Sequence, residues 1–266
     1  MEQATTTDKY EILQEDFIEV YGEKLYRIRT LKSFAGLDKG ELGGYIKMHK
    51  NLDQSGDAWV SGNAQVSGNA QVSGNAQVSG IARVSGDARV YGDACVSGIA
   101  RVYGDACVSG NAQVSGNARV SGNAQVSGIA RVYWDAWVSG DACVSGNAQV
   151  SGIARVSGNA RVYGDARVYG DARVSGDARV SGDARVYGDA RVHGQMDIIT
   201  VLDIGSERGC LTIHRDSEIG VRFTRGCFTG SIEEFLEAVE STHGDNMHGK
   251  VYKSLIETAK IQFGLD

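Results

Sequence analysis

Valine recurs at every sixth position from Val60 to Val192, and alanine recurs at every sixth position from Ala58 to Ala190. The repeating unit reads V-[SY]-G-[ND]-A-[QR]. Alternation along a strand places Ala and Val on one face and Gln or Arg with Ser or Tyr on the other. Gly followed by Asn or Asp tolerates the positive φ angles of a sharp corner. Each unit therefore predicts one short strand and one corner, and the unbroken period predicts a single solenoid.

The hexad resembles that of the left-handed β-helix, or hexapeptide-repeat, proteins of the transferase-like superfamily. In that family an aliphatic residue is followed four positions later by a small one, as in Val66 with Ala70 and Val72 with Ala76. The resemblance covers about half the chain. It implies triangular coils of three hexads, hence about eight coils over residues 55–194. We therefore expect a mainly β protein built on a left-handed parallel β-helix.

The two ends of the chain lack the repeat and predict separate domains. Residues 1–54 predict a β-rich N-terminal cap, in which Phe17–Val20 and Leu25–Ile28 form a hairpin and Gly40–Ile46 leads into the first coil. Such caps cover the strand edges that a solenoid would otherwise expose.

Residues 195–266 predict a small α+β C-terminal domain. The expected strands are 197–204, 210–214 and 219–223. Ser231 and Glu234 form a capping box that begins a helix, and Gly244 ends it. A last helix carries the apolar residues Val251, Leu255, Ile256 and Ile261.

Short segments of both ends resemble uncharacterised hexapeptide-repeat proteins of bacteria and their phages. These segments are Gly40–Ile46, Ser206–Gly209, Gly226–Gly230 and His243–Asn246. The resemblance implies a phage- or prophage-type protein and brings no known activity.

Composition predicts a cytoplasmic protein without a membrane segment. Met1–Thr7 has no apolar stretch behind it, and no segment is apolar enough to span a bilayer. The five cysteines form no CxxC pair, and their odd number fits a reducing compartment better than a disulfide framework.

Charge disfavours DNA or RNA as partners. Residues 55–194 contain 12 Arg and 11 Asp, so the net charge of −6 arises at the ends of the chain. Asp commonly precedes Arg by two positions, as in Asp165/Arg167 and Asp183/Arg185. We expect a solvated surface of paired charges rather than a basic stripe.

A few apolar residues break the polar exterior. Ile81, Ile99 and Ile153 differ by multiples of 18 and share one edge, whereas Ile129 lies on another. Trp134 replaces a corner glycine, with Tyr133 and Trp137 nearby. This aromatic cluster is either a contact patch or a local packing adjustment. The isoleucines favour a homo-oligomer, and a trimer is the assembly that the family resemblance implies.

Candidate ligand-binding residues concentrate in turns of the C-terminal domain, where sites are commonly built. They are Arg208, His214, Arg225, Cys227, Thr229, His243, Asp245 and Asn246. We expect this domain to capture a host protein or a nucleotide-like anionic molecule without catalysis. Two other constellations are a Cys227/His243 nucleophile pair and a zinc set of Cys210, His214, Cys227 and His243. Neither spacing is diagnostic, so no metal or cofactor is assigned.

Two alternative functions follow from the repeat itself. The resemblance implies an acyl- or acetyltransferase that uses acetyl-CoA, with His193 or His214 as the general base. Such enzymes carry a loop inserted between coils, but no hexad here is interrupted. The other alternative is recognition by the flat repeat array, such as ice binding, which strongly hydrated Arg and Asp rows suit poorly.

Overall fold

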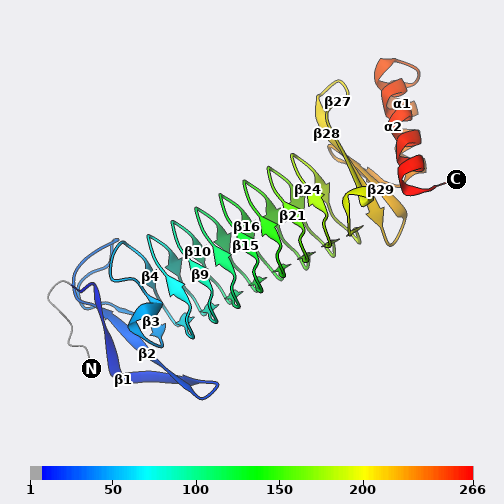
Figure 1. The fold of residues 1–266 in the computed structure, drawn as a ribbon. Helices are drawn as coiled ribbons and strands as arrows, with labels where there is room; N and C mark the ends of the chain where they lie inside the picture. The colour runs from blue at the N-terminus through cyan, green and yellow to red at the C-terminus, as the bar shows by residue number, and fades with distance from the viewer. Residues whose placement is uncertain (1–7, 266) are drawn as a thin grey trace. The chain divides into compact units, whose positions relative to one another are not determined.

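The computed structural model describes residues 8–265. The predicted absence of a leader rested on Met1–Thr7, which lies outside the described residues. The repeat winds into a parallel β-solenoid of about eight turns (Figure 1). It follows a β-rich N-terminal region and precedes a small part with an antiparallel sheet and two helices. The predicted fold class is confirmed at this level. The described residues divide after Asp141 into two compact units, each holding part of the repeat.

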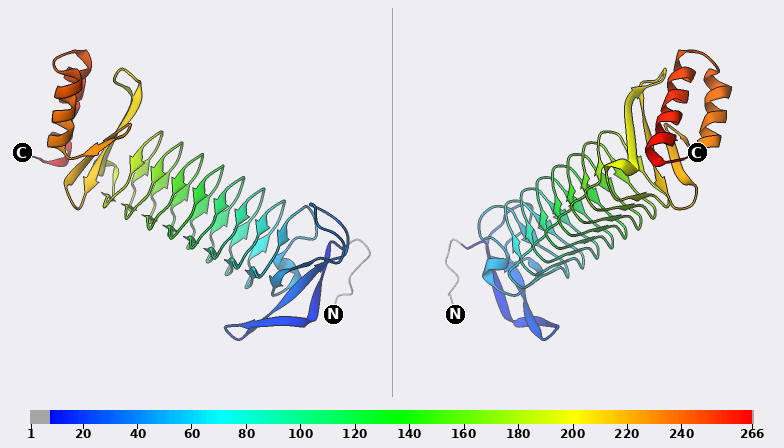
Figure 2. Two further views of the ribbon diagram at one scale, coloured as in Figure 1. Left: turned by 180° about the vertical axis from the view of Figure 1, so that it is seen from behind. Right: turned by 45° about the vertical axis from the view of Figure 1, so that its right-hand side comes forward.

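The N-terminal region begins with the predicted hairpin. β1 (Tyr10–Val20) pairs antiparallel with β2 (Glu23–Thr30) through a turn at Tyr21 and Gly22 (Figure 2). β3 (Leu42–Ile46) pairs with β2 and, in parallel, with the repeat strand β5 (Gln65–Val66). A short 3-10 helix, η1 (His49–Asn51), follows β3. The hairpin therefore continues one sheet of the solenoid.

The repeat strands of the first unit form three parallel sheets. Within it their orders are β5-β8-β11-β14-β17, β4-β7-β10-β13-β16 and β6-β9-β12-β15. Their partners lie 18 residues apart, as in Val66 beside Val84, so three hexads make one turn. The strands are β4 (Trp59–Val60), β5 (Gln65–Val66), β6 (Gln71–Val72), β7 (Gln77–Val78), β8 (Arg83–Val84), β9 (Arg89–Val90), β10 (Cys95–Val96), β11 (Arg101–Val102), β12 (Cys107–Val108), β13 (Gln113–Val114), β14 (Arg119–Val120), β15 (Gln125–Val126), β16 (Arg131–Val132) and β17 (Trp137–Val138).

The second unit continues the repeat. Its sheets are β20-β23-β26, β19-β22-β25 and β18-β21-β24. The strands are β18 (Cys143–Val144), β19 (Gln149–Val150), β20 (Arg155–Val156), β21 (Arg161–Val162), β22 (Arg167–Val168), β23 (Arg173–Val174), β24 (Arg179–Val180), β25 (Arg185–Val186) and β26 (Arg191–Val192).

The repeated valines and alanines form the solenoid core, as predicted. From Ala58 to Val192 every one of them is fully buried. Backbone hydrogen bonds join the turns, as from the Gln65 nitrogen to the Ala82 oxygen at 2.9 Å. All five cysteines are free.

The exterior differs from the predicted pairing of Asp with Arg. Among the described residues, Asp165 forms no ion pair with Arg167 and accepts a hydrogen bond from Asn147 Nδ2 at 2.9 Å. Arg185 likewise donates to the Gly226 oxygen at 2.9 Å rather than to Asp183. The predicted pairing is wrong at these two sites because Asp165 is bonded instead by the stacked asparagine of the preceding turn, and Arg185 by a turn of the C-terminal sheet.

The C-terminal part contains a four-stranded antiparallel sheet and two helices. The sheet order is β27 (Ile198–Ile204), β28 (Gly209–Asp216), β29 (Gly220–Arg225) and β30 (Phe228–Gly230), after a 3-10 helix η2 (Gln195–Asp197). The three predicted strands are confirmed with shifted ends, and β30 was not predicted. No helix among residues 8–265 is long and apolar enough to cross a membrane.

The helices cover one face of this sheet. α1 (Ile232–His243) begins with the predicted capping box, in which Ser231 Oγ accepts from the Glu234 nitrogen at 3.3 Å. α2 (Met247–Phe263) buries Ile256, but Ile261 of its predicted apolar stripe is 83% exposed. The core between sheet and helices includes Leu211, Ile213, Phe223, Phe235, Val239, Tyr252 and Ile256.

Candidate functional site

A pocket of about 290 Å³ lies where two turns of the C-terminal sheet meet the helices. The β27–β28 turn contributes Ser206 and Glu207, and the β29–β30 turn contributes Arg225 to Phe228. The remaining lining residues are Phe235, Ala238, Val239, Thr242, His243 and Tyr252. The pocket thus has an apolar floor and a few polar groups, which is the usual composition of a small-molecule site.

Arg225 is the cation of this pocket. Its Nη2 donates to the Ile204 oxygen at 2.9 Å and its Nε donates to Tyr252 Oη at 3.2 Å. Among the described residues no carboxylate pairs with it. A Cβ at Gly209 would overlap the guanidinium, so the absence of a side chain there makes room for it. Within residues 8–265 the half-buried charge therefore has neutral partners only.

His243 and Cys227 also line this pocket. The His243 ring stacks on Tyr252, with centroids 5.5 Å apart and planes 28° apart. Cys227 is exposed in the β29–β30 turn. Three predicted residues, Arg225, Cys227 and His243, are thus brought together. Tyr252, which connects Arg225 to His243, was missed because in the sequence it reads as another apolar position of a helix.

The other predicted ligand residues lie outside the pocket. Arg208 and Thr229 are exposed and do not line it. Asp245 forms an ion pair with Lys253 at 2.9 Å, and Asn246 Oδ1 caps α2 by accepting from the Gly249 nitrogen at 3.0 Å. These two residues organise the loop between the helices.

His214 is buried on the opposite face of the sheet. Its centroid lies 6.4 Å from that of Tyr187 in the solenoid, and its Nδ1 lies 3.0 Å from the Arg215 oxygen. Its Nε2 is buried and has no partner among the described residues. Burial lowers the pKa of His214 from 6.5 to about 4, so the ring is neutral at pH 7. A fully buried imidazole cannot contact a substrate that approaches from solvent.

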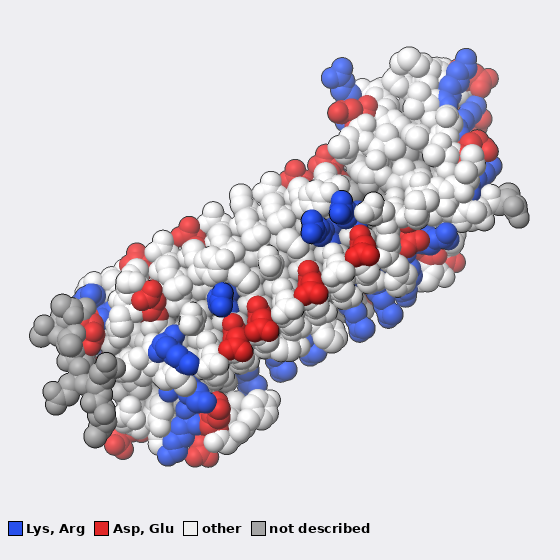
Figure 3. Space-filling model, in the orientation of Figure 1, with Lys and Arg blue, Asp and Glu red and all other residues white. Residues whose placement is uncertain are grey.

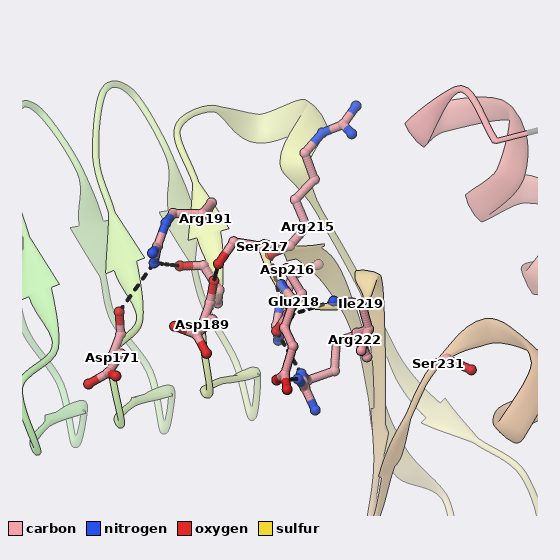
Figure 4. Close-up of polar contacts among 12 residues, drawn as sticks. Asp171, Asp189, Arg191, Arg215, Asp216, Ser217, Glu218, Ile219, Arg222 and Ser231 are labelled. Carbon is pink, nitrogen blue, oxygen red and sulfur yellow. Dashed lines mark hydrogen bonds and ion pairs between the residues drawn. The ribbon is translucent and has the colours of Figure 1, made fainter.

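Asp216 and Arg222 point toward each other (Figure 4). They lie on the same face of the sheet as His214, since Arg222 pairs with His214 and Asp216 follows two residues later on β28. Arg222 Nε donates to Asp216 Oδ2 at 2.7 Å, and the Glu218 and Ile219 nitrogens donate to Oδ1. Burial opposes ionisation, but these hydrogen bonds outweigh it and hold the pKa of Asp216 below its usual 3.8. The turn after β28 is thereby fixed against the last coil, where Ser217 Oγ donates to the Asp189 oxygen at 3.0 Å.

His193, the other predicted base, lies at the end of the repeat. Its Nδ1 is 2.6 Å from Ser175 Oγ, one turn earlier in the solenoid. Asp197 Oδ2 accepts from the His193 backbone nitrogen at 2.9 Å and does not orient the ring. The pair has the spacing of a nucleophile and its base, but among the described residues no carboxylate holds the second ring nitrogen.

The four residues of the alternative zinc set are not brought together. Cys210 and His214 lie on the solenoid side of the sheet, whereas Cys227 and His243 line the pocket near the helices. Within residues 8–265 no three His, Cys, Asp or Glu side chains group closely enough to hold a metal ion.

Comparison with known proteins supports the repeat. The family model described as YdcK beta solenoid repeat matches residues 64–80, 82–98, 112–128, 154–170, 166–182 and 178–194, about a third of the chain. A search of curated proteins finds no match. The matched segments all lie in the solenoid, so the chain is similar to this family in its scaffold, a repeat β-helix.

Proposed function

We propose that this protein is a non-enzymatic β-solenoid scaffold of phage or prophage type. Its C-terminal part captures a small anionic molecule in the pocket at Arg225. Five free cysteines agree with action in a reducing cytoplasm. The observation that carries the proposal is a half-buried guanidinium at the wall of a pocket, with no carboxylate partner in the described part of the chain.

The pocket favours a compact, nucleotide-like anion. Its volume of about 290 Å³ lies near the lower end of small-molecule sites, roughly 300 Å³. The stacked rings of His243 and Tyr252 offer an aromatic surface beside the Arg225 charge. Glu207 also lines the pocket, and its carboxylate disfavours ligands of high negative charge.

A thermal-shift and calorimetric screen with nucleoside monophosphates and inorganic phosphate tests this function. A ligand at about 100 times its Kd stabilises the fold by about 2.7 kcal/mol. Arg225→Gln and His243→Gln should each abolish the shift, whereas Arg161→Gln, on an exposed repeat arginine, should preserve it. A protein that binds none of these anions, or an Arg225→Gln variant that binds as well as wild type, would refute anion capture. A protein partner that requires Arg225 would reassign the pocket to the other predicted ligand class.

One observation favours the acetyltransferase alternative. His193 Nδ1 lies within hydrogen-bond distance of Ser175 Oγ and could accept its proton during acyl transfer. Turnover of acetyl-CoA that is lost in both Ser175→Ala and His193→Gln would establish this function. Turnover that persists in either variant would remove it.

A further inference from the structure

Three arginines stack on successive turns of one sheet in the first unit. Parallel pairing places Arg83 beside Arg101 and Arg101 beside Arg119. None of the three forms an ion pair among the described residues. Strands lie about 4.8 Å apart, so this arginine ladder spans about 9.6 Å. Like charges at this spacing repel one another, and the ladder therefore attracts a row of carboxylates.

An apolar row runs beside the arginine ladder. An aspartate stands two residues before Arg173 and before Arg191. At the corresponding positions before Arg83 and Arg101 the chain has Ile81 and Ile99 instead. These isoleucines are 52% and 43% exposed. Figure 3 shows basic side chains following one edge of the solenoid. The surface thus combines a cationic row with a parallel apolar row.

Trp134 extends the apolar row at a backbone position suited to glycine. Its φ is 61°, and the corresponding residues from Gly56 to Gly188 are otherwise all glycines with positive φ. Trp134 is 65% exposed and shares a hollow of about 460 Å³ with Ile81 and Ile99. A side chain in this conformation costs stability, and here it adds little core packing in return. Its placement therefore points to a contact surface.

Helix α1 carries a complementary pattern. Glu233, Glu237 and Glu240 are exposed and lie on one stripe, since their spacing is i, i+4 and i+7. Seven residues of helix rise about 10.5 Å, which matches the arginine ladder within about 1 Å. Leu236, 39% exposed, lies beside this glutamate stripe. Glu240 also pairs with Lys253, whereas Glu237 has no partner among the described residues.

We propose that α1 of a second copy docks along this surface. Its glutamate stripe lies on the arginine ladder, and its leucine lies on the apolar row. The contact joins two different surfaces, so it is head-to-tail, and it closes into a ring such as the predicted trimer or extends as a filament. This proposal goes beyond the anion pocket and does not depend on it. The surface is small and charged, so the association is weak and sensitive to salt.

Sedimentation velocity of the full chain over protein and salt concentration tests the proposal. Wild type should associate at low salt and dissociate as salt rises. Arg101→Glu and Glu237→Lys should each weaken association at least about tenfold, because each places like charges together. The variant that carries both changes should regain association, since the two charges are then exchanged across the contact.

Two further variants separate association from folding. Trp134→Gly restores the repeat pattern and should keep or raise the melting temperature while weakening association. Arg131→Glu is the matched control: Arg131 is exposed at the same hexad position after an isoleucine, but it neighbours Gln113 on another sheet. It should associate like wild type.

Three results would overturn the proposal. One is a wild-type protein that stays monomeric at low salt, whether or not its arginine ladder then binds a single-stranded oligonucleotide. Another is association unchanged by Arg101→Glu and Glu237→Lys. The third is a variant with both changes that associates no more strongly than either single variant.

Discussion

At the scale of single residues, the corner glycines set the limits of the solenoid. Gly86 has a φ of +70°, and a Cβ there would lie 2.9 Å from the Gly104 nitrogen on the next turn. Gly22, in the N-terminal hairpin, has a φ of +80° and open space around it. The first glycine serves both a backbone conformation and a close approach between turns, whereas the second serves only the conformation.

Replacement of these two glycines by alanine separates the two effects. Gly22→Ala should cost about 1–2 kcal/mol of unfolding free energy, the cost of a left-handed conformation with a side chain. Gly86→Ala should cost about 1–3 kcal/mol more, because its methyl group also crowds the backbone of the next turn. Urea unfolding measures both values. Equal losses would show that contact between turns does not constrain the corner.

At the scale of one element, β28 shows how far sequence can predict this protein. The sequence correctly predicted a strand over residues 210–214, and the structure places its Leu211 and Ile213 in the core. Thr212, His214 and Asp216 form its polar face, yet they too are buried. The pattern of a strand alone cannot show that this face is covered, because the covering residues belong to another element: Arg185 of the last coil donates from its backbone nitrogen to Thr212 Oγ1.

The same limit applies to the candidate site. Turn composition identified Arg225, Cys227 and His243, which do come together. It also selected Asn246, whose polar side chain caps a helix instead. β30 was missed because three residues are too few for alternation to be recognised. Local patterns predicted the repeated elements well, whereas the pocket depends on how unlike elements pack.

The buried position of His214 predicts a specific pH dependence. In the unfolded chain the imidazole binds a proton near pH 6.5, but in the fold it does so only near pH 4, because burial opposes the charge. The unfolded state thus binds more protons between these values, and stability is lost as pH falls from 6.5 to 4. The full loss is about 3 kcal/mol.

Urea unfolding at pH 7 and pH 4.5 measures this loss. His214→Gln cannot titrate and should remove most of the pH dependence. His248→Gln, which changes a partly exposed histidine in α2, should retain it. If His214→Gln loses as much unfolding free energy between pH 7 and pH 4.5 as wild type, the pH dependence does not come from His214.

At the scale of the whole molecule, the near-identical turns do not fix the strand register between turns, so contacts at the ends of the repeat must fix it. A slip by one turn keeps valine on valine and alanine on alanine, so the core barely distinguishes the two registers. Unique contacts occur where the repeat meets other elements. In the first unit Ile46 of β3 pairs with Val66, and in the second Asp216 of β28 bridges Ala190.

Deletion of residues 195–266 should therefore cause aggregation. It removes Thr212, whose Oγ1 accepts from the Arg185 nitrogen at 3.1 Å, and Ser217, whose nitrogen donates to the Asp189 oxygen at 3.2 Å. The last turn would then expose unpaired strand edges and an apolar core, which template association with other chains. The truncated chain also lacks α1 and cannot form the proposed head-to-tail contact. Light scattering in high salt, where that contact is screened in the full chain, should therefore show large particles of the truncated chain alone. Ser217→Ala removes one hydroxyl and keeps the cover, so it should scatter like wild type. A truncated chain that stays soluble and monodisperse would show that the C-terminal part does not protect the solenoid.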